Sequence, residues 1–187
     1  MGTIHKTNYE ALQEILSVYS KPGALILDMT FGTGAFWRGG QPSVSLDIVT
    51  RADVRASFYG LPFLGGVFDV VVFDPPYRMN GTRADYATTK RYKNKESNYR
   101  VVPKHYAAGV KEAHRVLRGG GLLVVKMQDQ VVSGKRYFQT NMMLKWAKDY
   151  SRMVDEVHVV TSSRPQPAGR AKRHLSAEHS TFQVWLK

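Results

Sequence analysis

The sequence predicts an α/β fold, a mostly parallel seven-stranded sheet with helices on both faces and one antiparallel edge strand. Three observations support this. Apolar runs typical of buried strands alternate with amphipathic helical segments. Carboxylates and glycine-rich turns directly follow several of these runs. The last two runs have no helix between them, which indicates an antiparallel pair. With 187 residues, 43% of them apolar, and no linker, we expect residues 1–187 to form a single domain.

The first half of the chain opens with an amphipathic helix over residues 9–19, because Leu12, Ile15, Leu16 and Tyr19 share one helical face. Lys21-Pro22-Gly23 ends this helix. Apolar runs then predict strands at 24–28, 44–48 and 67–73, with a further short strand at 53–56.

The second half begins with a predicted helix over residues 104–117, which stops at the glycine turn 118–121. A strand at 122–127 follows, and then a helix between 135 and 150. The closing strands are predicted at 154–161 and 181–186, and a basic loop, 162–180, separates them.

Three predicted strands end in an acid, namely Asp28, Asp47 and Asp74. In open parallel sheets ligands bind beyond the carboxyl ends of the strands, so we expect these acids to share one crevice. Gly32 and Gly34 form a G-x-G turn after the first strand, and such a turn allows the backbone to approach a ligand closely. A dinucleotide fingerprint needs a third glycine where Trp37 stands, which argues against a nicotinamide-dependent oxidoreductase.

The fourth strand runs directly into Asp74-Pro75-Pro76-Tyr77. This motif, together with the segment from Asp28 to Gly34 (DMTFGTG), resembles the two signature motifs of the S-adenosylmethionine-dependent DNA amino-methyltransferases, the N4/N6 DNA methylases. The resemblance is to small phage-type members without a separate target-recognition domain, and it extends to residues 118–122 and 173–182. It implies a Rossmann-like class I methyltransferase fold, S-adenosylmethionine as cofactor, and transfer to the exocyclic amine of adenine in DNA.

The resemblance also implies which residues hold the cofactor. The glycine turn and Phe31 would contact its methionine part, Asp28 would lie near its amino group, and Asp47 would bind the ribose. Ser57 stands where many relatives place an acid that meets the adenine amine, and a hydroxyl accepts that hydrogen bond more weakly. The full predicted set is Asp28, Thr30, Phe31, Gly32, Gly34, Phe36, Asp47, Ser57 and Phe58.

The predicted catalytic residues are Asp74, Pro75, Pro76 and Tyr77. An exocyclic amine is a poor nucleophile because its lone pair is delocalised into the base. The Asp74 carboxylate and the Pro75 carbonyl oxygen can each accept one amine hydrogen, which favours the tetrahedral nitrogen of the transition state. Tyr77 offers a flat ring on which an extruded base can stack.

The net charge of +12 is unevenly placed, because residues 1–77 carry a net charge of −2 and residues 78–187 carry +14. Such an imbalance favours a polyanion as partner, with nucleic acid (DNA first) ahead of an anionic membrane surface. Basic residues and aromatic rings lie in a predicted substrate-binding insertion, 78–104, and in the loop 162–180. The predicted nucleic-acid contacts are Arg78, Arg83, Lys90, Arg91, Tyr92, Lys93, Lys95, Arg170, Lys172 and Arg173.

Several alternatives stay open at this point. An RNA base methyltransferase acting on adenine or guanine, or a non-catalytic nucleic-acid-binding subunit, would carry much of the same pattern. Lys126, Gln128 and Asp129 either line a base pocket or, as we favour, are solvated loop residues, and Trp37 and Trp146 are expected to be anchors.

Other features of the sequence exclude whole classes of function. The chain has no cysteine, its six histidines lack metal-ligand spacing, and it has no apolar run of membrane-spanning length. We therefore expect no metal, no membrane insertion and a cytoplasmic location. The oligomeric state stays open, with a dimer or a partner subunit compatible with the sequence.

Overall fold

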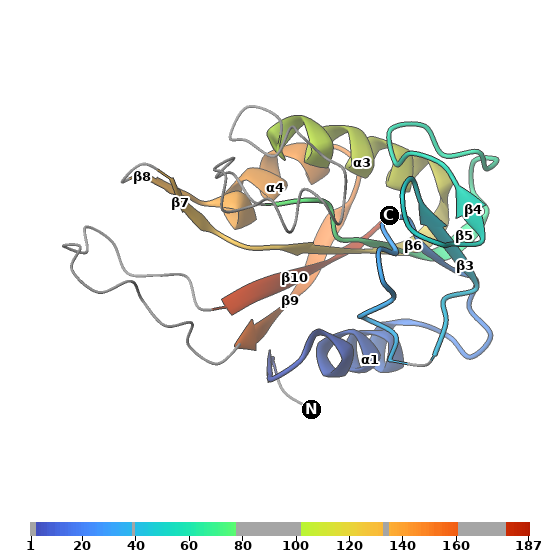
Figure 1. Ribbon diagram of the computed structural model, residues 1–187, viewed down its shortest axis with the longest axis horizontal. Coiled ribbons are helices and arrows are strands. Elements are labelled where there is room, and N and C mark those ends of the chain that lie inside the picture. The colour runs from blue at the N-terminus through green and yellow to red at the C-terminus, as the bar shows by residue number, and fades with distance from the viewer. Residues whose placement is uncertain (1–2, 39, 78–101, 133–134, 161–178) are drawn as a thin grey trace.

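The computed structural model describes residues 3–38, 40–77, 102–132, 135–160 and 179–187. Within them, an eight-stranded sheet has the order β1-β9-β10-β6-β5-β2-β3-β4, and β7 and β8 form a separate pair (Figure 1). The helices and strands of this part of the chain are β1 (Ile4–His5), α1 (Asn8–Tyr19), β2 (Ile26–Asp28), β3 (Val44–Asp47), β4 (Val54–Arg55), β5 (Phe68–Phe73), α3 (Val102–Val116), β6 (Leu117–Met127), β7 (Gln130–Val132), β8 (Lys135–Tyr137), α4 (Gln139–Ala147), β9 (Arg152–Val160) and β10 (His179–Leu186).

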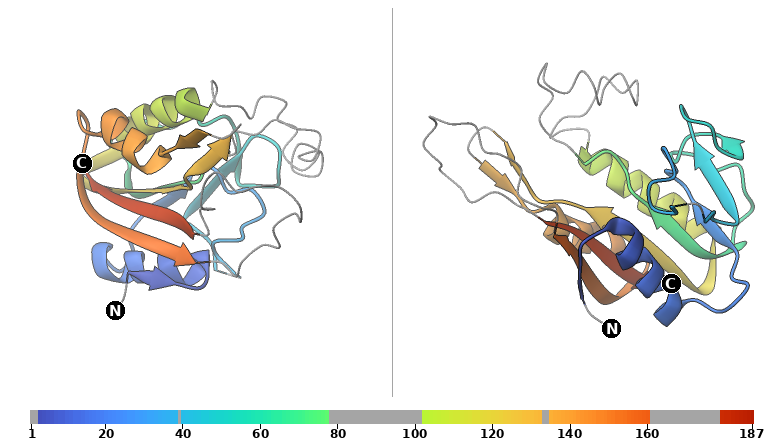
Figure 2. Two further views of the ribbon diagram at one scale, coloured as in Figure 1. Left: turned by 90° about the vertical axis from the view of Figure 1, so that its left-hand side faces the viewer. Right: turned by 60° about the horizontal axis from the view of Figure 1, so that its bottom comes forward.

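The sheet is the middle layer of three, with α1 on one face and α3 and α4 on the other (Figures 1 and 2). Each face has its own apolar core. Leu12 and Ile15 of α1 pack with Val70 and Val72 of β5, whereas α3 and α4 pack on the residues of β5 and β6 that point the other way. This alternation along β5 is what a strand buried on both faces requires, and it confirms the predicted open α/β class.

The strands β4, β3, β2, β5 and β6 are parallel neighbours, and β10 runs antiparallel to both β6 and β9. The predicted antiparallel pair is therefore present, but β10 lies inside the sheet rather than at its edge. The reason is burial: Ser180 to Trp185 are all buried in β10, whereas most of β9 is only half-buried or exposed. The sheet has eight strands rather than seven because β1 adds to β9.

Two further local predictions need correction. Residues 135–137, predicted as the start of a helix, form β8 and pair with β7, and only Gln139–Ala147 are helical. The β-branched pair Val131 and Val132 favours an extended partner here. The predicted turn at 118–121 lies within β6 as an irregularity, because Leu117 pairs with Phe68 and the register resumes at Leu122.

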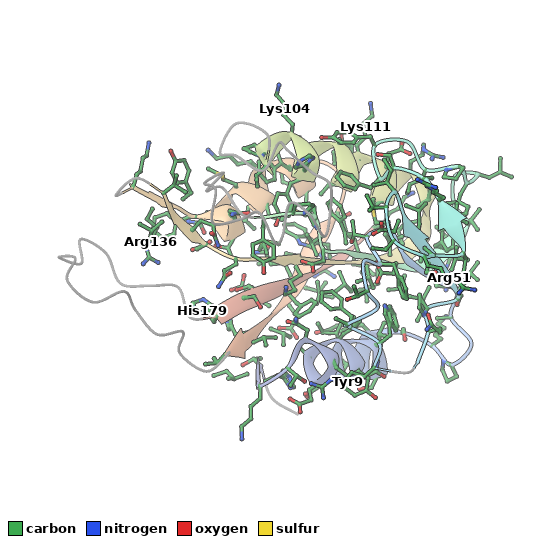
Figure 3. The ribbon with its side chains drawn as sticks, in the orientation of Figure 1. Tyr9, Arg51, Lys104, Lys111, Arg136 and His179 are labelled. Carbon is green, nitrogen blue, oxygen red and sulfur yellow. The ribbon has the colours of Figure 1, made fainter. Side chains whose placement is uncertain are left out.

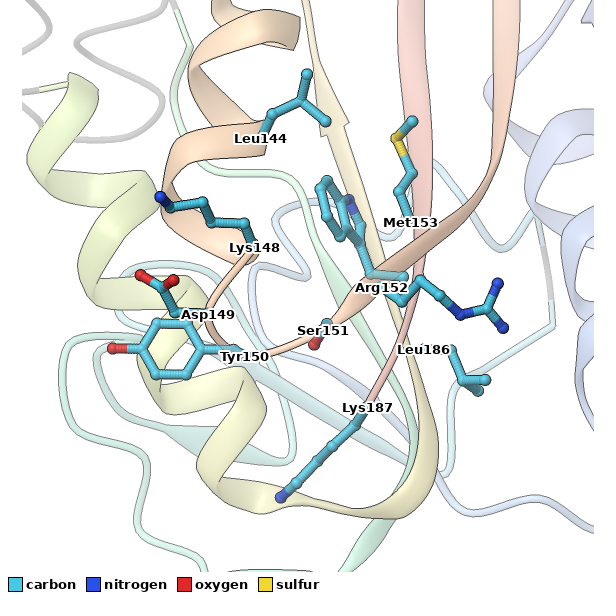
Figure 4. A pocket seen from close by; sticks show the side chains of 10 residues that line it. Leu144, Lys148, Asp149, Tyr150, Ser151, Arg152, Met153, Leu186 and Lys187 are labelled. Carbon is cyan, nitrogen blue, oxygen red and sulfur yellow. The ribbon is translucent and has the colours of Figure 1, made fainter.

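No helix in the described ranges is long and apolar enough to cross a membrane. A shallow surface hollow of about 860 Å³ lies between the end of α4 and the start of β9 (Figure 4). Leu186, which lines it, pairs with Leu122 near the start of β6. The hollow is therefore at the amino ends of the parallel strands, away from the acids described next.

Candidate active site

The carboxyl ends of β2, β3 and β5 bring Asp28, Asp47 and Asp74 to one edge of the sheet. The strand β2 lies between β3 and β5, with Asp28 in register with Ser45 of β3 and Val72 of β5. Asp74 follows β5 directly. Side chains from distant parts of the chain thus meet because parallel neighbours end at the same edge.

The turn after β2 is tied to β3 through its backbone. The Phe31 amide donates to the Leu46 carbonyl (3.0 Å), and the Gly34 amide donates to the Phe31 carbonyl (2.9 Å). Gly32 and Gly34 have φ angles of 57° and 70°, a region that glycine adopts without strain. A Cβ on Gly34 would lie 2.8 Å from Cζ of Phe31, so the ring closes over a position that only glycine leaves open.

Asp28 is buried, with 2% of its surface exposed. Its Oδ2 accepts a hydrogen bond from Nε1 of Trp37 (2.8 Å), and its Oδ1 accepts one from the Thr30 amide (3.0 Å). Burial raises the pKa of Asp28 to about 7, against the two hydrogen bonds and with the help of the nearby Asp74 and Asp47 charges. This carboxyl therefore titrates near neutral pH.

Asp47 experiences different surroundings. Burial raises its pKa, but hydrogen bonds from the amides of Thr50, Val49 and Gly32 outweigh burial, so the pKa of Asp47 lies below its usual range. Oδ1 accepts from Val49 (2.7 Å) and Thr50 (2.8 Å), and Oδ2 accepts from Gly32 (2.9 Å). Oδ2 keeps one lone pair for a further donor such as a hydroxyl.

Asp74 is linked to both the glycine turn and β6. Its amide donates to Oγ1 of Thr30 (2.7 Å), and its Oδ1 lies 3.5 Å from Nζ of Lys126. Oδ1 is buried and has no hydrogen-bond partner among the described residues. Burial raises the pKa of Asp74, and the Lys126 charge opposes that rise. Oδ1 of Asp74 is thus a hydrogen-bond acceptor at the end of β5.

Lys126 is a buried cation, with 5% of its surface exposed. Its Nζ lies 4.9 Å from the centre of the Tyr77 ring and 5.4 Å from that of Phe36. Burial lowers the pKa of Lys126, but Asp74 more than compensates, so the pKa lies above its usual value. The favoured solvated-loop assignment is wrong for this residue: Lys126 is inside β6 and joins Asp74, Tyr77 and Phe36 in one cluster.

The backbone at Tyr77 is held from α4. Nε2 of Gln139, a fully buried side chain, donates to the Tyr77 carbonyl (2.7 Å). Pro75 is buried, and Pro76 and the Tyr77 side chain are half-buried. Tyr77 packs against the core below α3 and α4, so its ring is fixed from one side.

The two other predicted cofactor residues lie beside the site. Phe58 makes an edge contact with Phe73, the residue before Asp74, with ring centres 5.4 Å apart. Ser57 closes its own turn, because its Oγ accepts from the Tyr59 amide (3.3 Å). No described contact links the Ser57 side chain to Asp28, Asp47 or Asp74.

Sequence reasoning missed the roles of three supporting residues, although it named Lys126 as one that could line a base pocket. Trp37, predicted only as an anchor, donates to Asp28, while Gln139 and Lys126 hold Tyr77 and Asp74. Asp129, proposed as a base-pocket or solvated residue, instead binds the start of α4, where its Oδ1 accepts from the amide and the hydroxyl of Thr140 (both 3.2 Å). The usable signal was Lys126 itself, a lysine inside the apolar run 122–127.

The predicted nucleic-acid contacts in 78–95 and 170–173 lie outside the described residues. The same holds for most of the insertion 78–104 and of the loop 162–180. Among the residues that the structure does describe, no group of three or more histidine, aspartate or glutamate side chains could hold a metal ion.

Comparison with solved structures identifies the fold. No family model matches the chain, and no curated protein sequence matches it. The PH0226 protein from Pyrococcus horikoshii OT3 is similar at a TM-score of 0.57 and 16% identity, over 95% of this chain and 88% of that one. N-methyltransferase NodS from Bradyrhizobium japonicum WM9, in complex with S-adenosyl-L-homocysteine, is similar at 0.54 and 12% identity, over 95% and 85%. The fold is thus the Rossmann-like class I methyltransferase fold that the motifs implied.

A candidate DNA modification methylase of Thermus thermophilus, complexed with S-adenosyl-L-methionine, is similar at a TM-score of 0.47 and 15% identity, over 67% of this chain. The present chain spans 50% of that protein's length.

Proposed function

We propose that this chain is an S-adenosylmethionine-dependent methyltransferase that acts on the exocyclic amine of adenine in DNA. The observation that carries the proposal is the end of β5. There Oδ1 of Asp74 is buried, has no hydrogen-bond partner among the described residues and lies 3.5 Å from Nζ of Lys126. Pro75 and Tyr77 follow Asp74 in the chain, and the same Lys126 Nζ lies 4.9 Å from the centre of the Tyr77 ring. This acceptor lies at the same edge of the sheet as the glycine turn.

The residues at the carboxyl edge fit the cofactor. Gly32 and Gly34, at φ angles of 57° and 70°, form the turn at this edge. Asp28 offers a carboxylate to an ammonium group, and Oδ2 of Asp47 has a lone pair for a ribose hydroxyl. When bound there, S-adenosylmethionine supplies an electrophilic methyl group.

Atoms of the chain itself then orient the substrate amine. Oδ1 of Asp74 and the Pro75 carbonyl oxygen each accept one amine hydrogen, which turns the nitrogen lone pair toward the methyl group. Tyr77 stacks the base and sets its plane, and Gln139 fixes that residue's backbone. Asp74 accepts hydrogen bonds without first removing a proton, because the methylated ammonium product loses its proton readily.

Two features support DNA adenine as the substrate. The strongly basic second half of the chain fits a polyanion. An aspartate at position 74 is, by the resemblance to the amino-methyltransferases, the usual residue of adenine enzymes. The presence of Asp28, Asp47 and Asp74 at one edge of the sheet also favours a catalytic protein over a non-catalytic subunit.

The test is transfer of labelled methyl from S-adenosylmethionine to duplex DNA, single-stranded DNA and RNA in parallel, with the product nucleoside identified by mass spectrometry. We expect N6-methyladenine in DNA. The Asp74→Ala variant should lose transfer by at least about a hundredfold while keeping its cofactor affinity, because Asp74 acts on the amine.

Each other result has a definite meaning. Methylation confined to RNA would move the substrate to an RNA base, and a fully active Asp74→Ala variant would refute the mechanism. A protein that binds nucleic acid but neither binds the cofactor nor transfers methyl would be the non-catalytic subunit.

A further inference from the structure

The β7–β8 hairpin, whose described arms are Gln130–Val132 and Lys135–Tyr137, extends outward from the candidate active site. It follows β6 immediately, and Figures 1 and 2 show it projecting past α4 on the side where β6 ends. Figure 3 places Arg136 at the outer end of this projection. Each arm has three residues, so the hairpin reaches about 10 Å at roughly 3.3 Å per residue.

The base of the hairpin is fixed to the site from both arms. On the incoming arm, Lys126 lies against Asp74 four positions before β7 begins. On the outgoing arm, Gln139 donates to the Tyr77 carbonyl (2.7 Å). Asp129 joins the two arms through its hydrogen bonds to Thr140 (3.2 Å). A group bound along the hairpin would therefore be held at a set position relative to Tyr77.

The outgoing arm and Phe138 combine cations with aromatic rings, with Lys135 and Phe138 exposed and Arg136 and Tyr137 half-buried. Lys135 is exposed and its Nζ lies 5.5 Å from the centre of the Tyr137 ring, while Cζ of Arg136 lies 5.9 Å from that of Phe138. Phe138 is 49% exposed, so part of its ring is open to a ligand beside Arg136. From Gln130 to Lys148 the chain has four basic residues and no acid.

We propose that the β7–β8 hairpin with Phe138 binds the nucleic-acid strand next to the target base. Lys135 and Arg136 contact phosphates, and Phe138 stacks against a neighbouring base. The proposal rests on the proposed function, because it gives the hairpin the substrate of the same site. It assigns to nucleic-acid binding a segment that the sequence predicts as the start of a helix.

A peptide strand added to the edge of the hairpin is the main competing occupant. Charge favours the nucleic acid: a segment with two adjacent cations and no acid matches a row of phosphates, whereas peptide addition depends on backbone pairing and does not need them. The exposed ring gives a second surface that every base can use, whatever the sequence.

The experiment measures binding of fluorescein-labelled single-stranded DNA, its duplex and the RNA of the same sequence by fluorescence anisotropy, over a range of salt concentrations. The variants are Lys135→Ala/Arg136→Ala, Lys135→Ala, Lys135→Glu, Phe138→Ala and Phe138→Tyr. The control is Lys21→Ala/Lys111→Ala, which removes the same charge from two exposed positions elsewhere, one after α1 and one on α3. Circular dichroism and thermal unfolding verify that each variant is folded.

The double variant should bind about tenfold more weakly or worse than the control, and its slope of log affinity against log salt should fall by up to about 2. Lys135→Glu should weaken binding further than Lys135→Ala. Phe138→Ala should weaken single-strand binding by about tenfold, and Phe138→Tyr should restore it because a tyrosine ring stacks as well.

The hairpin proposal is overturned if the hairpin variants bind and methylate like the Lys21/Lys111 control while the wild type transfers methyl to nucleic acid. That result leaves the proposed function intact. If the wild type neither binds nucleic acid nor transfers methyl to it, both proposals fail. Cofactor affinity, measured on every variant, should stay unchanged, since no cofactor residue is altered.

Discussion

Asp28 and Asp47 end neighbouring strands, yet their surroundings shift their pKa values in opposite directions. Asp47 is half-buried, accepts three backbone hydrogen bonds and stays ionised. Asp28 is buried and accepts only one hydrogen bond from the backbone and one from Trp37. The pKa of Asp28 therefore rises to about 7. A carboxyl that is half-protonated near neutral pH pairs with a cationic ligand only in its ionised fraction.

Cofactor binding should depend on pH through Asp28. The protonated form predominates below pH 7 and pairs poorly with an ammonium group, so affinity for S-adenosylhomocysteine should fall about tenfold from about pH 8 to about pH 6. Titration calorimetry at the two pH values tests this. Asp28→Asn should bind weakly and equally at both, and a wild-type affinity independent of pH would contradict the assignment.

The same shift affects stability without ligand. Because the folded-state pKa is above the ordinary value of 3.8, the folded chain holds a proton that the unfolded chain has released between about pH 4 and pH 7. This contribution to stability is complete below the ordinary pKa and is lost as pH rises through 7. Binding of a cation at Asp28 offsets this loss of folding stability.

Lys126 acts on Asp74 through charge, and we expect it to be a positioning residue. Lys126→Met removes the cation that opposes the rise of the Asp74 pKa, so the acid limb of the kcat profile should move to higher pH. Transfer at mildly acidic pH should fall by about tenfold or more, with recovery at higher pH. Steady-state methyl transfer against pH measures this, and Lys111→Met is the matched control.

At the scale of elements, the glycine turn and the base of the hairpin fix the positions of Asp47, Asp74 and Tyr77. The turn connects β2 to β3 through Gly32 and Asp47, and to β5 through Thr30 and the Asp74 amide. Three strands of the sheet are thereby cross-linked by one short loop. A disturbance in that loop should reach both the cofactor residues and Asp74.

Gly34→Ala tests the turn. The substitution places a Cβ against the Phe31 ring and requires an L-residue at φ 70°, so the free energy of unfolding should fall by about 1–2 kcal/mol and cofactor affinity by about tenfold. Denaturant unfolding and calorimetry measure the two effects.

Gly23→Ala is the matched control for that substitution. Gly23 has a φ of 76° with no atom within 4 Å of an added Cβ, so it carries the backbone strain without the clash. It should lose stability but keep its cofactor affinity. Equal affinities in the two variants would show that the Phe31 contact is unimportant for binding.

At the scale of the whole molecule, charge is distributed unevenly along the chain. The three acids of the site come from the first 77 residues, which carry a net charge of −2, whereas residues 78–187 carry +14. The fold brings residues of both parts together at the carboxyl edge, where Nζ of Lys126 from β6 lies 3.5 Å from Oδ1 of Asp74. A buried cation from the basic part of the chain thus pairs with an acid of the proposed site.

Nucleic-acid affinity should consequently be strongly salt-dependent. We expect it to fall at least tenfold between about 50 and 200 mM salt, because release of condensed counterions drives the binding. Affinity for S-adenosylhomocysteine should change far less over that range. Anisotropy and calorimetry on the same preparation test both, and salt-independent nucleic-acid binding would show that the positive charge serves another purpose.

The sequence alone was sufficient to predict the open α/β class, most strand positions and the acids at the strand ends. These features are local: apolar runs identify buried strands, and the residue after such a run lies at the sheet edge whatever the neighbours are. The Asp74-Pro75-Pro76-Tyr77 motif is equally local, because the prolines restrict the backbone by themselves.

Only the tertiary structure decided the rest. The place of β10 between β6 and β9 depends on which strand buries more of its surface, and periodicity within one strand does not report that comparison. Residues 135–137 became β8 because β7 was available to pair with them. Lys126 is stable in the interior because Asp74, from a distant strand, supplies the opposite charge. Burial, pairing and charge compensation are relations between segments, so they are set only when the chain has folded.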